Sequence, residues 1–316
     1  MREINYRVTI TSPSGYDFKV RYIIYCTDEK QNIPSISPHN INNTLKDTRR
    51  VEGVFYLGNP KIKKEDACLT ITVHFPESVE AFRLQYNREP MFDPSIASLV
   101  LTKYNPLCSE NKTLPQKDGT IEMINAGLTL IKQLCPFVKS VDLKDMSSRI
   151  CDDGSSISLP YFYITIHRQT WYEKQFRARL RPAAMYDAYR ATLQNFFSSP
   201  LESFNIFAIR FLRECNGPVL SAIQTAYEAS TTMDDFFRTL YKNNGVPMGC
   251  ILLNKWIDTL MRVAKIAPYM NHEWYIDMEQ VPMWNLKNTA GPLKINRKER
   301  GTRRNSAIWL GGIRIN

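Results

Sequence analysis

Residues 118–145 read DGTIEMINAGLTLIKQLCPFVKSVDLKD, and the hydrophobic period changes within this stretch. Its first half places apolar side chains at the spacing of one helix face: Ile121, Ile124, Leu128, Ile131 and Leu134. Pro136 is expected to end this helix. Residues 138–145 then alternate between apolar and polar side chains, which is typical of a strand. A helix that leads directly into a strand indicates an α/β unit.

The residues before this unit predict mostly β-structure. Residues 6–12 and 18–26 flank the turn signal PSGYD and predict a hairpin. Further strands are expected at VEGVFYLG (51–58), ACLTITVHF (67–75), AFRLQY (81–86) and SIASLVLTKY (95–104). A second helix is expected over 157–176, with Ser158 as its N-cap. Residues 1–180 are therefore predicted to form one α+β domain with a mixed sheet.

The following segment is predicted to be a small helical subdomain over residues 181–270. Ser199 and Glu202 have the spacing of a capping box, which predicts a helix start there. Thr232 with Asp235 predicts a second start, and Gly245 is placed to end that helix. Residues 250–266 have the pattern of one amphipathic helix. Residues 271–316 are expected to be an irregular aromatic segment followed by an extended basic tail.

The positive charge is concentrated in that tail. The chain of 316 residues has a formal net charge of +10, and residues 287–316 hold eight Lys and Arg side chains against one Glu. Such a segment is typical of contact with an acidic surface, nucleic acid or membrane headgroups. The predicted partner-binding residues are Arg297, Lys298, Arg300, Arg303, Arg304, Trp309, Leu310 and Ile313. Apolar anchors beside arginines favour a groove on a neighbouring protein, with nucleic acid or a purely solubilising extension as alternatives.

Other composition signals bound the class of protein. The seven cysteines contain no CxxC pair, which favours buried free thiols in a reducing compartment. Neither these cysteines nor the four histidines have the spacing of a metal site, so no metal is expected. No apolar run approaches the roughly 18 residues of a transmembrane helix, and none is predicted. The N-terminus alternates like a strand and lacks the apolar core of a secretory signal.

The sequence shows no complete catalytic motif. GxSxG, HExxH and the phosphate-binding glycine loops are all missing. Asp142, Asp145, Asp152 and Asp153 are interpreted as solvated loop carboxylates, although such a cluster could hold a cation. His167 is interpreted as a core-edge histidine rather than a general base, because no carboxylate precedes it by one helical turn.

Residues 114 to about 180 are the part of the chain that resembles known proteins. A DGT-x-x-MI helix, a strand ending in Asp, a Cys-containing loop and the segment TWYEKQF (170–176) follow one another. This order resembles a set of uncharacterised proteins encoded by large nucleocytoplasmic DNA viruses. That resemblance implies a viral protein located in the virion and the host cytoplasm.

The same region also resembles the core of the GNAT N-acetyltransferases. In that family the pyrophosphate of acetyl-CoA binds at a glycine-rich loop and helix N-terminus, where Gly119 and Thr120 stand in this sequence. A tyrosine of a later helix serves as general acid, and Tyr172 occupies the matching place. The chain has one loop glycine where the family has two, and its Tyr172–Phe176 spacing is one residue short. No cofactor is therefore predicted.

Three functions follow as hypotheses from these patterns. The leading one is a structural, non-catalytic component of a large DNA virus particle, a minor capsid or capsid-associated protein. Its basic tail would bind neighbouring capsid or virion proteins. The alternatives are an acetyl-CoA-dependent acyltransferase on a degenerate GNAT-like core, and a viral nucleic-acid-binding protein.

Overall fold

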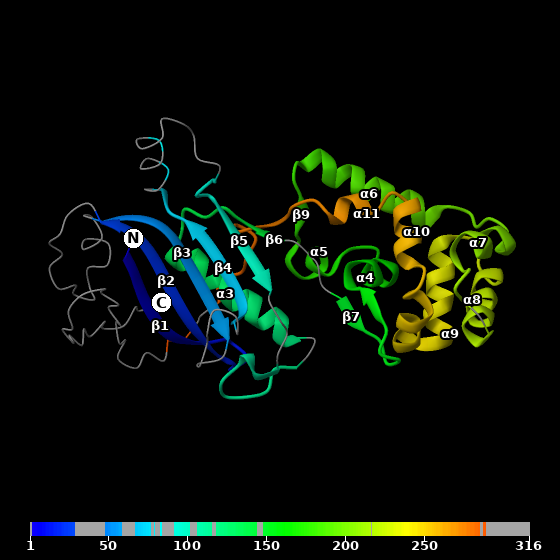
Figure 1. The fold of residues 1–316 in the computed structure, drawn as a ribbon, viewed down its shortest axis with the longest axis horizontal. Helices are drawn as coiled ribbons and strands as arrows, with labels where there is room; N and C mark the ends of the chain where they lie inside the picture. Colours follow the sequence, from blue (N-terminus) through cyan, green and yellow to red (C-terminus); the bar gives the residue numbers. More distant parts are fainter. Residues whose placement is uncertain are drawn as a thin grey trace. The chain divides into compact units, whose positions relative to one another are not determined.

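The chain folds as an α+β protein with a large mixed sheet, which confirms the predicted class (Figure 1). The computed structural model describes residues 2–28, 48–58, 67–76, 79, 83, 92–101, 106–115, 118–143, 148–215, 217–284 and 287–288. The contacts divide the chain into two compact units. Unit 1 contains residues 1–143 and 276–316, and unit 2 contains residues 144–275.

Unit 1 is built on the sheet. Its strands are β1 (Arg2–Thr11), β2 (Asp17–Asp28), β3 (Thr48–Gly58), β4 (Ala67–His74), β5 (Ile96–Leu101), β6 (Ser140–Leu143) and β11 (Lys287–Asn288). They lie in the order β11-β1-β2-β3-β4-β5-β6. The pairs from β11 to β5 are antiparallel, whereas β5 and β6 are parallel, with Ile96 opposite Ser140. Arg83 lies within the predicted strand 81–86 but is helical, so the strand is wrong at that residue.

The helix of the opening stretch covers one face of this sheet (Figure 1). It is α3 (Asp118–Leu134), and its predicted apolar face is buried at Ile124, Leu128 and Ile131. Gly127 lets the helix approach the sheet closely, since a Cβ there would lie 2.9 Å from a methyl of Leu69. The α3 connection joins two parallel strands, which require a crossover of this kind. The helix–strand prediction over 118–145 is thus confirmed for its described residues, 118–143.

Unit 2 begins with a small β-hairpin and continues as helices. The hairpin strands are β7 (Ser148–Ile150) and β8 (Ser156–Ser158), and the short pair β9 (Arg179–Leu180) and β10 (Trp274–Asp277) is antiparallel. The helices are α4 (Leu159–His167), α5 (Trp171–Phe176), α6 (Ala183–Ser198), α7 (Phe204–Phe211), α8 (Gly217–Glu228), α9 (Met233–Leu253), α10 (Ile257–Val263) and α11 (Ala267–Met270).

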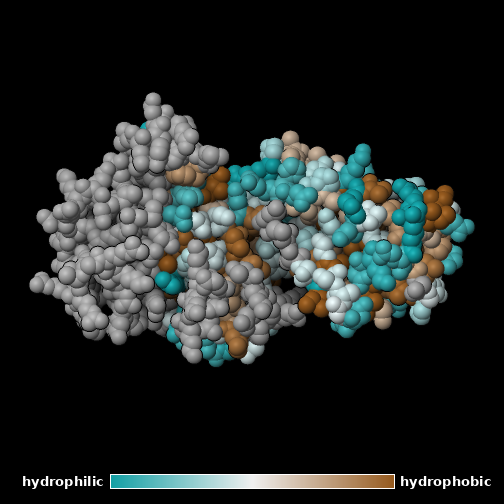
Figure 2. Space-filling model, in the orientation of Figure 1, coloured by the Kyte–Doolittle hydropathy of each residue, from teal (hydrophilic) through white to brown (hydrophobic). Residues whose placement is uncertain are grey.

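Aromatic side chains fill the interior of the helical part of unit 2. The ring of Phe207 lies within 6 Å of the rings of Tyr227, Phe236 and Trp256, at centroid distances of 4.4, 5.9 and 5.5 Å. On the opposite side, α7 exposes Ile206 and Ile209, and Figure 2 shows hydrophobic side chains at the surface over this helix. The helix therefore buries its aromatic face and leaves its isoleucine face outside.

Two predicted helices are broken in the structure. The predicted helix 157–176 is wrong as one element, because α4 ends at His167, its C-cap Arg168 has a left-handed φ of 57°, and Thr170 then caps α5. The predicted helix 250–266 is also wrong as one element, since α9 ends at Leu253 and α10 starts at Ile257. In both places a local cap or turn interrupts a hydrophobic pattern that continues across it.

The predicted caps had mixed outcomes. The Thr232 hydroxyl accepts the backbone N–H of Asp235 and caps α9, as expected. Gly245 has a φ of 74° at a break inside α9, which confirms it as the end of the first helical segment. The box at Ser199 and Glu202 is wrong: α7 starts later, and Glu202 instead binds Arg210 at 3.1 Å.

Four cysteines are paired rather than free, so the expectation of free thiols is wrong for them. Cys68 of β4 is bonded to Cys108 of η3 (Pro106–Cys108), and Cys151 is bonded to Cys250 of α9. Their sequence separations of 40 and 99 residues give no spacing signal. Cys135 and Cys215 are buried and form no disulfide, as expected.

The structural units differ from the domains expected at 1–180, 181–270 and 271–316. Residues 144–180 belong to unit 2, because α4 packs against α9 and α10 of that unit. Residues 276–284 and 287–288 belong to unit 1, where β11 pairs with β1. None of the helices in the described part of the chain has both the length and the apolar character that a membrane span requires.

Candidate functional site

The segment TWYEKQF is the most specific part of the viral resemblance. It contains the N-terminal cap of α5 and a buried glutamate. The Thr170 hydroxyl accepts the backbone N–H of Glu173 at 3.2 Å, and the Thr170 N–H donates to Glu173 Oε2 at 2.7 Å. This is a capping box, in which each residue satisfies the other's free backbone donor. Glu173 is buried while doing so, with a side chain only 3% exposed.

Side chains from α6 complete the surroundings of this carboxylate. The Tyr189 hydroxyl donates to Glu173 Oε2 at 2.9 Å, and the Tyr186 hydroxyl donates to Oε1 at 3.1 Å. Arg190 places Nη1 3.5 Å from Oε1. Burial raises the pKa of Tyr189 well above its usual range, and the Glu173 charge adds to this shift. The cluster thus fixes the start of α5 to α6 through one buried charge.

We expect the free energy of unfolding of unit 2 to fall as the pH rises from 10 to 12. Burial, with a smaller contribution from Glu202, raises the pKa of Tyr227 from 10.0 to about 12. The pKa of Tyr189 is raised as well. A raised folded-state pKa gives a stabilisation that is complete below the unfolded pKa and is lost above it. Urea unfolding at a series of pH values measures this slope. The Tyr227→Phe variant should flatten it, and an unchanged slope would contradict this assignment.

A surface pocket of about 530 Å³ lies beside the Glu173 cluster, within unit 2. It is lined by Arg168, Arg190, Leu193, Gln194, Phe197, Ser198, Thr232 and Asp234. The α6 residues recur every three or four positions and so share one face of that helix. The buried side chains of Leu193 and Phe197 form its apolar base. Arg168 comes from the turn between α4 and α5, and Thr232 and Asp234 come from the start of α9.

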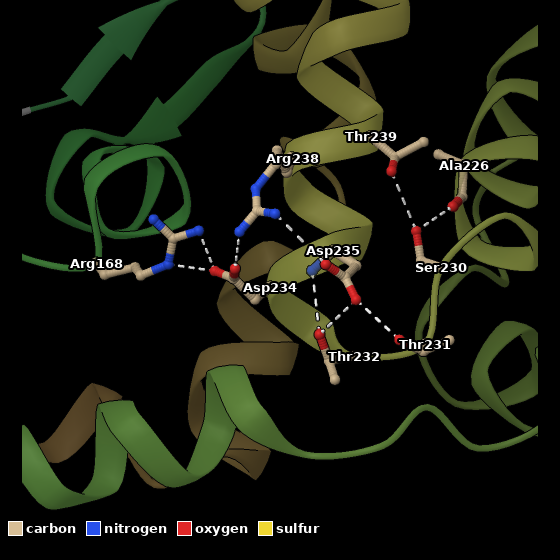
Figure 3. A network of polar contacts seen from close by, with 9 residues as sticks. All are labelled: Arg168, Ala226, Ser230, Thr231, Thr232, Asp234, Asp235, Arg238 and Thr239. Atoms are coloured by element: carbon tan, nitrogen blue, oxygen red, sulfur yellow. Dashed lines mark hydrogen bonds and ion pairs between the residues drawn. The ribbon is translucent and has the colours of Figure 1, made fainter.

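Ion pairs hold the α9 side of this pocket (Figure 3). Arg168 and Arg238 both bind the Asp234 carboxylate, and the guanidinium of Arg168 also lies 5.6 Å from the ring centroid of Phe197. The adjacent Asp235 points to the hydroxyls of Thr231 and Thr232 (Figure 3). The Thr231 hydrogen bond is the largest cause that lowers the pKa of Asp235. The Asp234 carboxylate therefore binds two arginines, and the Asp235 carboxylate accepts from two threonine hydroxyls and lies 3.6 Å from Arg238.

The tyrosine predicted as a catalytic candidate lies in a packed aromatic group. Tyr172 is 5% exposed, and its ring centroid is 4.9 Å from that of Trp171. Phe176 lies next to both rings. The ring of His167 lies tilted against that of Tyr163, with centroids 4.2 Å apart, and its Nδ1 is 3.3 Å from the Lys174 ammonium. These contacts give Tyr172 and His167 a place in the packing of α4 and α5, while the general-acid role of Tyr172 stays a prediction.

The candidate cofactor residues stand at the start of α3. The Gly119 N–H donates to the Pro115 carbonyl at 2.9 Å, so this donor is already used. A Cβ at Gly119 would lie 2.6 Å from Cβ of Leu114. Thr120 is buried beside it. The glycine is therefore required by close packing against Leu114, independently of any cofactor.

Replacing Gly119 with alanine is expected to lower the free energy of unfolding by about 1–3 kcal/mol, because the new methyl overlaps the rigid Cβ of Leu114. Chemical denaturation measures the change. Gly127→Ala in the same helix is the matched control, since it meets the mobile methyl ends of Leu69 and Ile71. We expect the smaller loss there, and equal losses would contradict the packing argument.

The remaining predictions concern the tail residues and a metal site. The tail residues from Arg297 to Ile313 lie outside the described part of the chain. Among the described residues, no three His, Cys, Asp or Glu side chains gather as a metal site would require. Sequence reasoning missed Arg168, Arg190 and Asp234, which lie far apart in the chain. The only signal available was the spacing of Arg190 and Gln194 on one face of a helix.

Comparison with protein-family models, curated proteins and solved structures finds no match to this chain.

Proposed function

We propose that this chain is a structural, non-catalytic component of a large DNA virus particle. The observation that carries the proposal is the use of TWYEKQF as internal scaffolding. Thr170 and Glu173 cap α5, and the carboxylate is surrounded by Tyr186, Tyr189 and Arg190. The viral resemblance rests on TWYEKQF, and the polar groups of this segment therefore make contacts that stabilise unit 2. A rigid unit of this kind suits a building block of an assembly.

The basic tail is the part of the chain that we assign to partner contact in this role. Its arginines would steer the encounter, and the apolar residues around Trp309 would anchor it in a groove of a neighbouring subunit. Charged residues at a rim mainly affect the association rate, whereas buried apolar anchors supply affinity. Other capsid or virion proteins are therefore the partners proposed.

Quantitative mass spectrometry of purified particles tests the role. We expect the protein in fixed stoichiometry with the capsid proteins, and a chain lacking residues 290–316 should be expressed but not incorporated. Absence of the full chain from particles would overturn the proposal. Loss of a salt-dependent DNA shift on the same deletion, with normal incorporation, would favour the nucleic-acid alternative instead.

An acyltransferase is the second candidate, and one feature of unit 1 favours it. The parallel strands β5 and β6 are joined through α3, an arrangement expected from the GNAT-like resemblance. Calorimetric titration with acetyl-CoA discriminates the two functions. Binding of acetyl-CoA, together with turnover that is lost in Tyr172→Phe, would support the enzyme. Absence of heat at millimolar acetyl-CoA would exclude it.

A further inference from the structure

We propose that the pocket between α6 and the start of α9 binds a phosphate group, with Arg190 as its principal ligand. The pocket has a volume of about 530 Å³ and is lined by two arginines, an amide, two hydroxyls and one carboxylate. Phosphate recognition by proteins uses arginine forks, hydroxyls and the start of a helix, all of which meet here. The inference concerns unit 2 and is separate from the role of the tail.

The Arg190 guanidinium is hydrogen-bonded through Nη1 and partly exposed to solvent. Its Nη1 donates to the Arg168 carbonyl at 3.0 Å and lies 3.5 Å from Glu173. A guanidinium carries five N–H donors in one plane, so Nε and Nη2 remain for a ligand. The side chain is 44% exposed, whereas its partner Glu173 is 3% exposed. The buried carboxylate fixes the orientation of the fork, and less conformational freedom is lost when a ligand binds.

Arg168 supplies a second positive charge to the lining. Its Nε and Nη2 are the atoms that contact Asp234, and the ring of Phe197 supports the guanidinium. The charge of Asp234 is shared with Arg238, so two arginines face one carboxylate. Asp235, the other nearby acid, accepts from the hydroxyls of Thr231 and Thr232 and lies 3.6 Å from Nη1 of Arg238. Arg168 and Arg238 are therefore balanced by Asp234 and Asp235, and the outward N–H groups of Arg190 are the donors that the lining offers to an anion.

Gln194 adds a neutral donor to the site. Gln194 follows Arg190 by one turn of α6 and lines the same pocket with an exposed amide. Thr232 is the N-cap of α9, and its hydroxyl already bonds the backbone N–H and the carboxylate of Asp235, so it lines the site without adding a donor. Leu193 and Phe197 are buried beneath these groups and give them a rigid base.

The test adds one negative charge to the lining. Gln194→Glu keeps the size of an exposed side chain, and Asn195→Asp places the same charge at the adjacent exposed residue, which does not line the pocket. Inorganic phosphate is titrated into the full-length chain and followed by calorimetry. We expect the wild type and Asn195→Asp to bind alike, and Gln194→Glu to bind roughly tenfold more weakly or not at all.

A second variant and a second probe sharpen the outcome. Arg190→Lys keeps the charge beside Glu173 but loses the fork, and it should also weaken binding. Adenosine monophosphate tests the source of the phosphate: tighter binding than inorganic phosphate indicates an organic ligand, and equal binding indicates the phosphate group alone. The proposal is overturned if phosphate does not bind the wild type, or if Gln194→Glu and Asn195→Asp bind it equally.

Discussion

Replacement of Glu173 by alanine is expected to lower the free energy of unfolding of unit 2 by about 3–5 kcal/mol. The variant leaves the Thr170 N–H and the buried Tyr189 hydroxyl without their acceptor. Arg190 also loses its carboxylate partner. Loss of one member of a buried network costs more than an average hydrogen bond, because the remaining polar groups stay buried and unpaired.

Urea unfolding followed by tryptophan fluorescence measures this loss, since Trp171, Trp256 and Trp274 all lie in unit 2. Glu228→Ala is the matched control: this glutamate is exposed on α8 and should change stability by less than about 0.5 kcal/mol. Glu173→Gln should fall between the two, because it keeps an acceptor but not the charge. A loss in Glu173→Ala as small as that of the control would show that TWYEKQF does not hold unit 2 together.

The hydrophobic period of the sequence predicted those helices and strands in which a single apolar pattern runs along the whole element. The apolar face of residues 118–134 is buried on the sheet as α3, and β4 alternates as its sequence does. The period failed where a cap interrupts a continuous pattern. Arg168 ends α4 in a left-handed conformation, and the Thr170 capping box begins α5 after it. Both signals were present, but the capping box S/T-x-x-E at 170–173 was interpreted as part of a longer helix.

The candidate pocket was beyond sequence reasoning for a different reason. Arg168, Arg190 and Asp234 are separated by 22 to 66 positions, and the turn of the chain between α4 and α5 brings them together. No hydrophobic period or sequence motif predicts that these three side chains lie close together, since their proximity depends on how the helices pack. The same holds for Cys151 and Cys250, which lie 99 residues apart and were expected to be free thiols because the sequence has no CxxC pair.

Removal of the Cys151–Cys250 bond is expected to lower the free energy of unfolding of unit 2 by about 4–5 kcal/mol. The bond joins the loop of the β7–β8 hairpin to the second segment of α9, with the two Cα atoms 5.6 Å apart. Its loop spans 99 residues, so it removes much of the conformational freedom of the unfolded chain. The Asn254 amide donates to the Ser155 hydroxyl nearby, and this contact should persist without the bond.

The double variant Cys151→Ser/Cys250→Ser, unfolded in urea beside the wild type, measures the effect. Reductant should destabilise unit 2 of the wild type by a similar amount and leave that of the double variant unchanged. Cys215→Ser is the control, because this buried thiol forms no bond and its replacement should cost about 1 kcal/mol or less. The bond between Cys68 and Cys108 closes a shorter loop of 40 residues in unit 1, and its removal should cost somewhat less, about 4 kcal/mol. If reductant shifts neither unit, the four cysteines are not paired in the folded protein, and the loop argument does not apply to it.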